Sequence, residues 1–202
     1  MNRTLRISFL ASAFAMLALQ VVAQNTSSAP VTGQTIQDRK ENQQDRIGQG
    51  VQSGQLTAGE AANLEKKEAA VNQEERDMRK LDNGKLTASD RATLNQQQNQ
   101  LSKQIYNDKH NAAVQNTNPK TEVGKRQENQ QDRIAQGIKS GQLTPKEAAH
   151  LEGRETAINK EIKNDRAANG GKLTPAERRQ VNRRENRTSK AIYRKKHNAR
   201  TQ

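Results

Sequence analysis

The sequence predicts an all-α protein made of two tandem copies of a three-helix unit, placed after an N-terminal signal peptide. Three observations predict this fold. The motif Gly-x-Leu-Thr-x-x-acid occurs four times, each time between stretches with helical apolar spacing. The chain also repeats itself with a period of 87 residues. Large aliphatic residues are scarce, which indicates thin contacts between helices in place of one thick core.

Residues 1–23 have the order of a secretory signal peptide: two arginines, an apolar run at 7–19, and then small residues. We expect cleavage after Ala23, export to the periplasm or the exterior of a bacterium, and a polar, disordered segment at 24–36. The apolar run is too short to span a bilayer as a helix, so we expect no membrane span after cleavage. An uncleaved membrane anchor is the alternative.

We expect copy one at residues 37–112 and copy two at 124–199, joined by a flexible linker at 113–123. The segments ENQQDR and SGQLT occur in both copies, and the tail IYNDKHNA of the first matches IYRKKHNA of the second. Pro119 and its polar neighbours favour the linker. The packing of the two copies is left open, and a homo-oligomer that completes the thin helix seams is one alternative.

The four repeated turns are predicted to join helices. Thr followed three residues later by an acid is the spacing of a capping box, in which the hydroxyl accepts from a backbone amide and the acid accepts from the cap amide. The Gly three residues before each Thr suits the left-handed end of the preceding helix. Two turns add Pro at the first helical position. The predicted caps are Thr57 with Glu60, Thr87 with Asp90, Thr144 with Glu147, and Thr174 with Glu177.

Each predicted helix has a narrow apolar stripe that favours helix-on-helix seams over strands. Tyr106 and Tyr193 are expected to pack, and His110 and His197 to end helices, where the helix dipole favours a cation. The predicted helices are 37–52, 58–80, 88–111, 124–139, 145–167 and 175–198, and the stripes contain Leu64, Val71, Met78, Leu94, Leu101, Ile105, Leu151, Ile158, Ile162, Val181 and Ile192.

The two copies differ in charge. Residues 34–117 carry 12 basic and 12 acidic side chains, whereas residues 118–202 carry 21 basic and 10 acidic ones. In the last predicted helix, five cations spaced by four, four, three and four residues share one face. Such a row suits phosphate-rich partners, namely lipopolysaccharide, another anionic surface or extracellular nucleic acid. The predicted polyanion-binding residues are Arg179, Arg183, Arg187, Lys190 and Arg194.

The turns resemble two known motifs. They are similar to the second half of an EF-hand loop, but Arg79 and Arg166 stand at the leading ligand position of two turns, where a cation repels calcium. The segment LTPAERRQ (173–180) resembles the LTxxQ motif of small periplasmic stress chaperones. Over residues 38–199 the chain resembles exported bacterial helical repeat proteins with G-x-L-T-x-x-E turns, a family that implies no established activity.

We therefore expect a non-catalytic exported binding protein without cofactor, catalytic residues or metal site. The sequence has no Cys, no Ser–His–acid grouping, no His-x-x-x-His pair and no phosphate loop. Three alternatives stay open. The first is a periplasmic stress or chaperone-like protein, which the LTxxQ resemblance implies; the second is a divergent EF-hand-like metal-binding protein. The third is a basic face that is only solvated.

Overall fold

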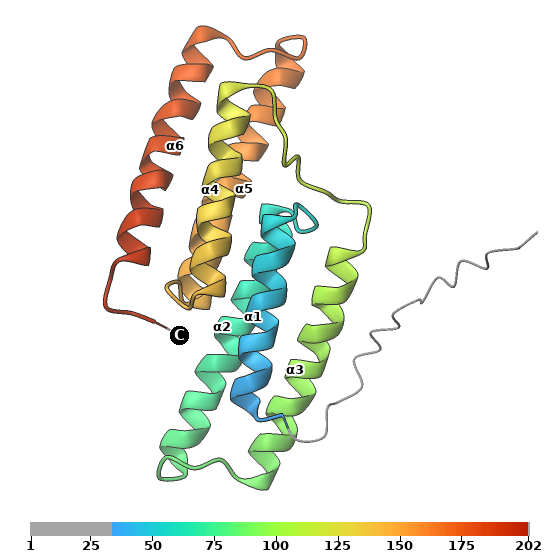
Figure 1. Cartoon of the computed structure of the whole chain (residues 1–202), viewed down its shortest axis with the longest axis vertical. Helices are drawn as coiled ribbons and strands as arrows, with labels where there is room; N and C mark the ends of the chain where they lie inside the picture. Colours follow the sequence, from blue (N-terminus) through green and yellow to red (C-terminus); the bar gives the residue numbers. More distant parts are fainter. Residues whose placement is uncertain (1–33, 202) are drawn as a thin grey trace, which may run out of the picture.

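The structure is a computed structural model that describes residues 34–201, so the predicted signal peptide lies outside the described residues. This part of the chain is all-α, with six helices and no strand. It is elongated, with α1–α3 towards one end and α4–α6 towards the other (Figure 1). The helices are α1 (Ile36–Gln52), α2 (Ala58–Leu81), α3 (Ala88–Lys109), α4 (Glu122–Lys139), α5 (Pro145–Ala168) and α6 (Pro175–Lys196).

All four predicted capping boxes are present. At the start of α6, for example, the Glu177 amide donates to the Thr174 hydroxyl at 3.3 Å, and the Thr174 amide donates to the Glu177 carboxylate at 2.8 Å. The four turn glycines have positive φ as predicted, such as 88° at Gly171. A fifth box, Thr35 with Asp38, begins α1 and was missed in the sequence, although it has the same spacing.

Replacing Thr87 by Ala is expected to lower the free energy of unfolding by about 1 kcal/mol, the usual loss for a helix N-cap. Thr87 is exposed, and its hydroxyl accepts from the Asp90 amide at 3.1 Å, so the cap accounts for the effect. Urea denaturation followed by circular dichroism measures it. The control Thr87→Ser keeps the hydroxyl and should stay close to wild type; equal losses in both variants would contradict the capping role.

The helix ends lie within two residues of the predicted ones, and caps explain the larger differences. α4 begins at Glu122, inside the predicted linker, because the Thr121 hydroxyl accepts from the Gly124 amide at 3.1 Å. α3 and α6 end two residues earlier than predicted. Their C-caps are His110 and His197, which confirms that both histidines lie at helix ends.

The segment between α3 and α4 lies against the first turn. The Gln115 amide donates to the Gly54 carbonyl at 2.8 Å, and the Gln115 side-chain oxygen accepts from the Ala58 amide at 3.2 Å. Ala58 is the first residue of α2, where an amide lacks a helical partner. At the corresponding place in α5 stands Pro145, which has no N–H to satisfy. Gln115 thus completes the start of α2.

The main core lies where the two groups of helices meet. α2 packs on α5 and α1 on α4, and one hydrophobic cluster draws residues from all six helices. Smaller clusters lie around Leu94 and around Val181. The predicted stripe residues are buried, with the exception of Met78, which is only partly buried. The main cluster consists of Ile47, Val51, Leu56, Ala61, Leu64, Leu101, Ile105, Ile134, Ala135, Ile138, Leu143, Ala148, Leu151, Ala191 and Ile192.

Glutamates fill interior space that the sparse aliphatic residues leave. Glu65 and Glu68 on α2, and Glu152 and Glu155 on α5, are at most 1 % exposed. Burial raises the pKa of Glu152 and of Glu155 to about 8 and that of Glu68 to about 7. Glu68 lies four residues after Leu64 and three before Val71, so it continues their stripe. For Glu68 that spacing was a sequence signal of burial.

Candidate polyanion-binding face

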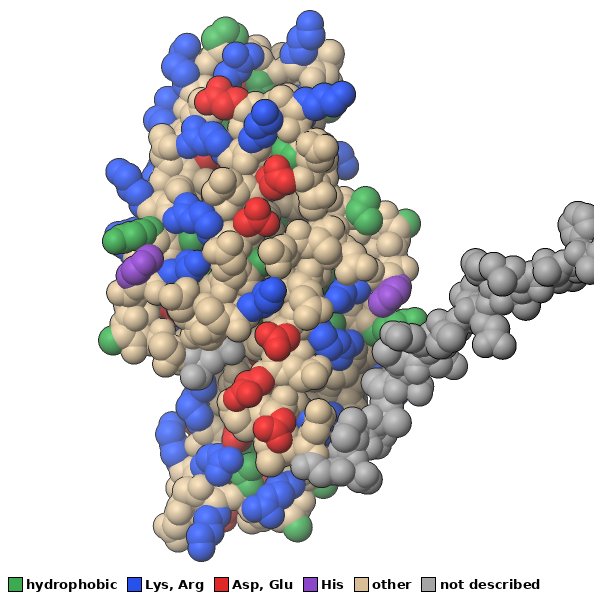
Figure 2. Space-filling view, viewed as in Figure 1, with side chains coloured by type: hydrophobic (Ala, Val, Ile, Leu, Met, Phe, Trp, Pro, Cys, Tyr) green, Lys and Arg blue, Asp and Glu red, His purple; other side chains and the backbone are tan. Residues whose placement is uncertain are grey.

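Helix α6 buries one side and exposes the other. Val181, Thr188 and Ile192 are at most 2 % exposed. The five predicted cations, which we call the α6 cation row, are all exposed. The space-filling view shows Lys and Arg side chains along the edge of the molecule that α6 forms (Figures 1 and 2). The row consists of Arg179, Arg183, Arg187, Lys190 and Arg194.

Within the described residues, no member of the α6 cation row forms an ion pair with a carboxylate. Other cations of the same helix do: Arg184 pairs with Glu161, and the Lys195 ammonium lies 3.8 Å from the Glu147 carboxylate. The helix therefore directs these paired cations towards neighbouring elements and the α6 cation row towards solvent. The row is a surface of uncompensated positive charge.

Helix α3 provides an internal comparison, because its residues stand 87 positions before those of α6. At the places of the five cations it has one cation and four uncharged residues, and all five are exposed as in α6. The two surfaces thus share backbone position and exposure and differ in charge. The α3 residues are Ala92, Gln96, Gln100, Lys103 and Asn107.

A shallow hollow of about 500 Å³ lies at the C-terminal end of the row. Arg133 of α4 lies beside it, and its guanidinium donates to the Ser189 hydroxyl at 2.7 Å. Lys190, Tyr193 and Arg194 line the remainder of the hollow. Three cations and one aromatic ring therefore surround one surface depression.

The two tyrosines, which were expected to pack, do so only against a histidine and remain exposed. Tyr106 is 50 % exposed and Tyr193 is 59 % exposed. Each ring stacks on the histidine that follows by one helical turn, with ring centroids 4.2 Å apart. Their position near the C-terminal ends of α3 and α6, one residue after a buried Ile, turns them away from the core.

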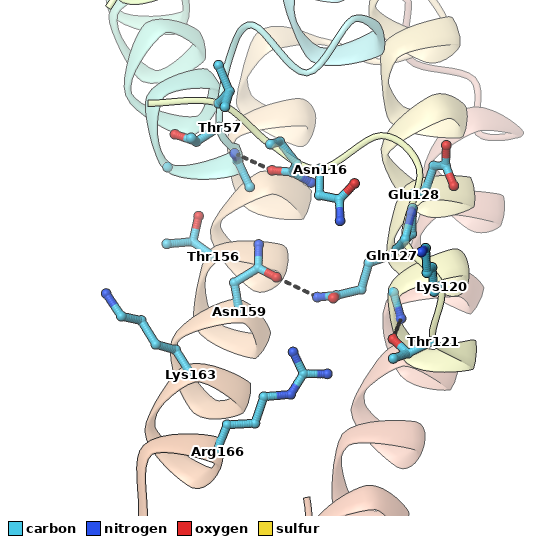
Figure 3. A pocket seen from close by; sticks show the side chains of 16 residues that line it. Thr57, Asn116, Lys120, Thr121, Gln127, Glu128, Thr156, Asn159, Lys163 and Arg166 are labelled. Atoms are coloured by element: carbon cyan, nitrogen blue, oxygen red, sulfur yellow. Dashed lines mark hydrogen bonds between the residues drawn. The ribbon is translucent and has the colours of Figure 1, made fainter. Parts of the chain in front are cut away.

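A second hollow, of about 680 Å³, lies between the start of α2, the segment before α4 and the side of α5 (Figure 3). Some of its polar groups are hydrogen-bonded to one another. The Gln127 side chain donates to Asn159 at 2.6 Å, and Thr121 accepts from the Gly124 amide. Lys163 and Arg166 add positive charge at its wall. No buried side-chain atom among its lining residues lacks a hydrogen-bond partner, so we place the candidate site on α6.

The turns offer little to a metal ion. The Arg79 guanidinium pairs with Glu75 of α2 at 2.8 Å and donates to the Gly84 carbonyl at 3.2 Å. A backbone oxygen of the second turn is therefore already bonded to a cation. Across residues 34–201, no three or more side chains of His, Asp or Glu lie together in a way that would hold a metal ion.

The fold and this face define an all-α protein with one strongly basic exposed helix. No family model matches the chain, and neither the curated proteins nor the solved structures include a similar one. None of the helices in the described part combines the length and the apolar character needed to cross a membrane. The geometry and charge of α6 are therefore the features that bear on function.

Proposed function

We propose that this protein is an exported, non-catalytic helical protein that binds polyanions through the α6 cation row. The observation that carries the proposal is that five exposed cations share one face without a carboxylate partner in the described part of the chain. Like charges on one helix face repel each other, and a phosphate-rich ligand relieves that repulsion while releasing its own counterions.

We also propose that the chain is a duplicated three-helix unit of the exported bacterial repeat type. Hydrogen bonds at positions 87 residues apart support the duplication. Gln44 donates to buried Glu65 and Gln131 to buried Glu152, at 3.2 Å and 2.9 Å. The signal-like residues 1–23 support a location in the bacterial periplasm or outside the cell.

A chaperone-like role receives less support from the geometry. Such a role needs apolar surface to hold unfolded clients, whereas the aliphatic seams lie in the interior between helices. The exposed charge of α6 is the larger accessible feature. Polyanion binding is therefore the function that the described surface favours.

The test is heparin binding by the chain without residues 1–23, measured over a range of salt concentrations. Replacing the five row residues by Gln is expected to weaken binding at low salt by at least about tenfold. The slope of log K against log salt should fall by about 0.9 for every phosphate-type contact that is lost, a value measured on duplex DNA. Unchanged affinity and slope in this variant would contradict the proposal.

Helix α3 supplies the matched control. Placing Arg at Ala92, Gln96, Gln100 and Asn107 of the neutralised variant, where Lys103 is already present, builds the row on the other helix. These positions are exposed, so the fold should tolerate the change. Recovery of salt-sensitive binding would show that the row itself is the determinant. No recovery, in a variant with wild-type helicity, would show that the surroundings of α6 contribute.

A further inference from the structure

Tyr193 is a large, partly apolar ring that the fold holds at the surface. His197 stacks on it with ring centroids 4.2 Å apart, and the Tyr193 carbonyl accepts from the His197 ring at 2.7 Å. The stacked histidine covers one face of the ring, and the side chain is still 59 % exposed. A fixed ring with an open face is the kind of platform on which proteins stack the bases of single strands.

The cations around this ring come from two helices. Lys190 and Arg194 belong to α6, and Arg133 reaches the same hollow from α4, where Ser189 holds its guanidinium through the hydroxyl at 2.7 Å and the carbonyl at 3.4 Å. The lining of the hollow contains no carboxylate. In the first group of helices, Arg46 and Lys103 stand at the places of Arg133 and Lys190, but uncharged Asn107 and acidic Asp108 replace Arg194 and Lys195.

We propose that this hollow is a nucleotide subsite: a base stacks on Tyr193, and the adjoining phosphates lie against Arg133, Lys190 and Arg194. The ligand of the α6 cation row is then single-stranded nucleic acid. From Arg179 to Arg194 the row extends about 22 Å along the helix, enough for several nucleotides. This inference depends on the proposed polyanion binding and specifies its ligand.

The ring is what separates this ligand from other polyanions. Sulfated sugars and lipid headgroups have no aromatic face, and the bases of a duplex are stacked on one another. An exposed ring among cations therefore favours unpaired bases over these partners. Binding that depends on cations alone would not distinguish these partners.

Tyrosine fluorescence tests the stacking directly, because the chain has no Trp and only two Tyr residues. In Tyr106→Phe, Tyr193 is the only fluorophore, and a thymidine oligonucleotide of about ten residues, within the range of single-strand site sizes, should quench its emission. In the matched variant Tyr193→Phe, the remaining Tyr106 reports from the less basic helix and should show no comparable quenching. Equal quenching in both variants would overturn the inference.

Affinity provides the second readout. Tyr193→Ala should bind the oligonucleotide roughly tenfold more weakly, within the range expected for one stacked base, with an unchanged salt slope because no cation is removed. Tyr193→Phe should retain affinity, and heparin binding should be unaffected by either change. Since Tyr193 is exposed, circular dichroism should confirm that the Ala variant keeps its helices.

The outcomes separate the two proposals. If heparin and oligonucleotide bind with strong salt dependence but Tyr193→Ala changes neither affinity, the nucleotide subsite is wrong and polyanion binding stands. Equal losses for both ligands in that variant would also overturn the subsite. If neither ligand binds the unaltered protein, both proposals fail.

Discussion

Replacing Leu64 by Ala is expected to lower the free energy of unfolding by about 2 to 5 kcal/mol, the usual range for a buried leucine. The same replacement at Leu81, on the same helix, should change it by less than about 0.5 kcal/mol. Leu64 is fully buried in the cluster that joins all six helices, whereas Leu81 is 83 % exposed. The pair therefore separates core packing from helix propensity.

The expected loss in the free energy of unfolding is large because few aliphatic residues form the core, so each contributes a larger fraction of its stability. A domain of ordinary stability unfolds at a cost of about 5 to 15 kcal/mol, so one cavity in the joint between α2 and α5 removes a large part of it. Urea denaturation followed by circular dichroism measures both variants. Similar midpoints for Leu64→Ala and Leu81→Ala would show that the two groups of helices do not pack as described.

The free energy of unfolding is expected to fall as the pH rises from about 5 to about 8, because several glutamates are buried. Burial raises the pKa of Glu152 and of Glu155 from 4.5 to about 8. Between these values the folded protein keeps protons that the unfolded chain releases, so rising pH favours unfolding. Burial acts likewise on Glu68 and Glu185, whose pKa values rise to about 7.

Glu152→Gln tests this explanation, because the amide is neutral at every pH. At pH values near 5 the variant should match the wild type within about 1 kcal/mol, and near pH 8 it should be the more stable protein by more than about 1 kcal/mol. Glu177→Gln is the control. The Thr174 amide lowers the pKa of the Glu177 carboxyl, so its proton is absent throughout this range and the slope should not change. A pH profile as steep in Glu152→Gln as in wild type would contradict the explanation.

The helices and their caps could be predicted from the sequence because they depend on neighbours within one turn. Thr174 finds its partner three residues away at Glu177, and Gly171 needs only its own backbone freedom to end α5. The exposure of the cations also followed from spacing, since Val181 and Ile192 are apolar and mark the buried side of α6.

Residue type alone did not indicate the burial of Glu152 or the exposure of Tyr193. Residue type ranks a glutamate as a surface residue and places a tyrosine between surface and interior. Glu152 is buried because α2 and α5 pack along the face that holds it, and Tyr193 is exposed because it points away from the core that Ile192 joins. Arg133 borders the candidate site from α4, a helix distant from α6 in sequence, so no local pattern placed it there.

By itself the sequence determined where the described helices begin and end, to within two residues, and which side of α6 carries the uncompensated cations. Capping, glycine conformation and helical periodicity are short-range effects, and each is complete within a few residues. Only the tertiary structure decided that the six helices share one core, that carboxyl groups lie inside it, and that Arg133 and Tyr193 border one hollow. Those features depend on contacts between residues far apart in the chain, and burial is a property of the packed whole.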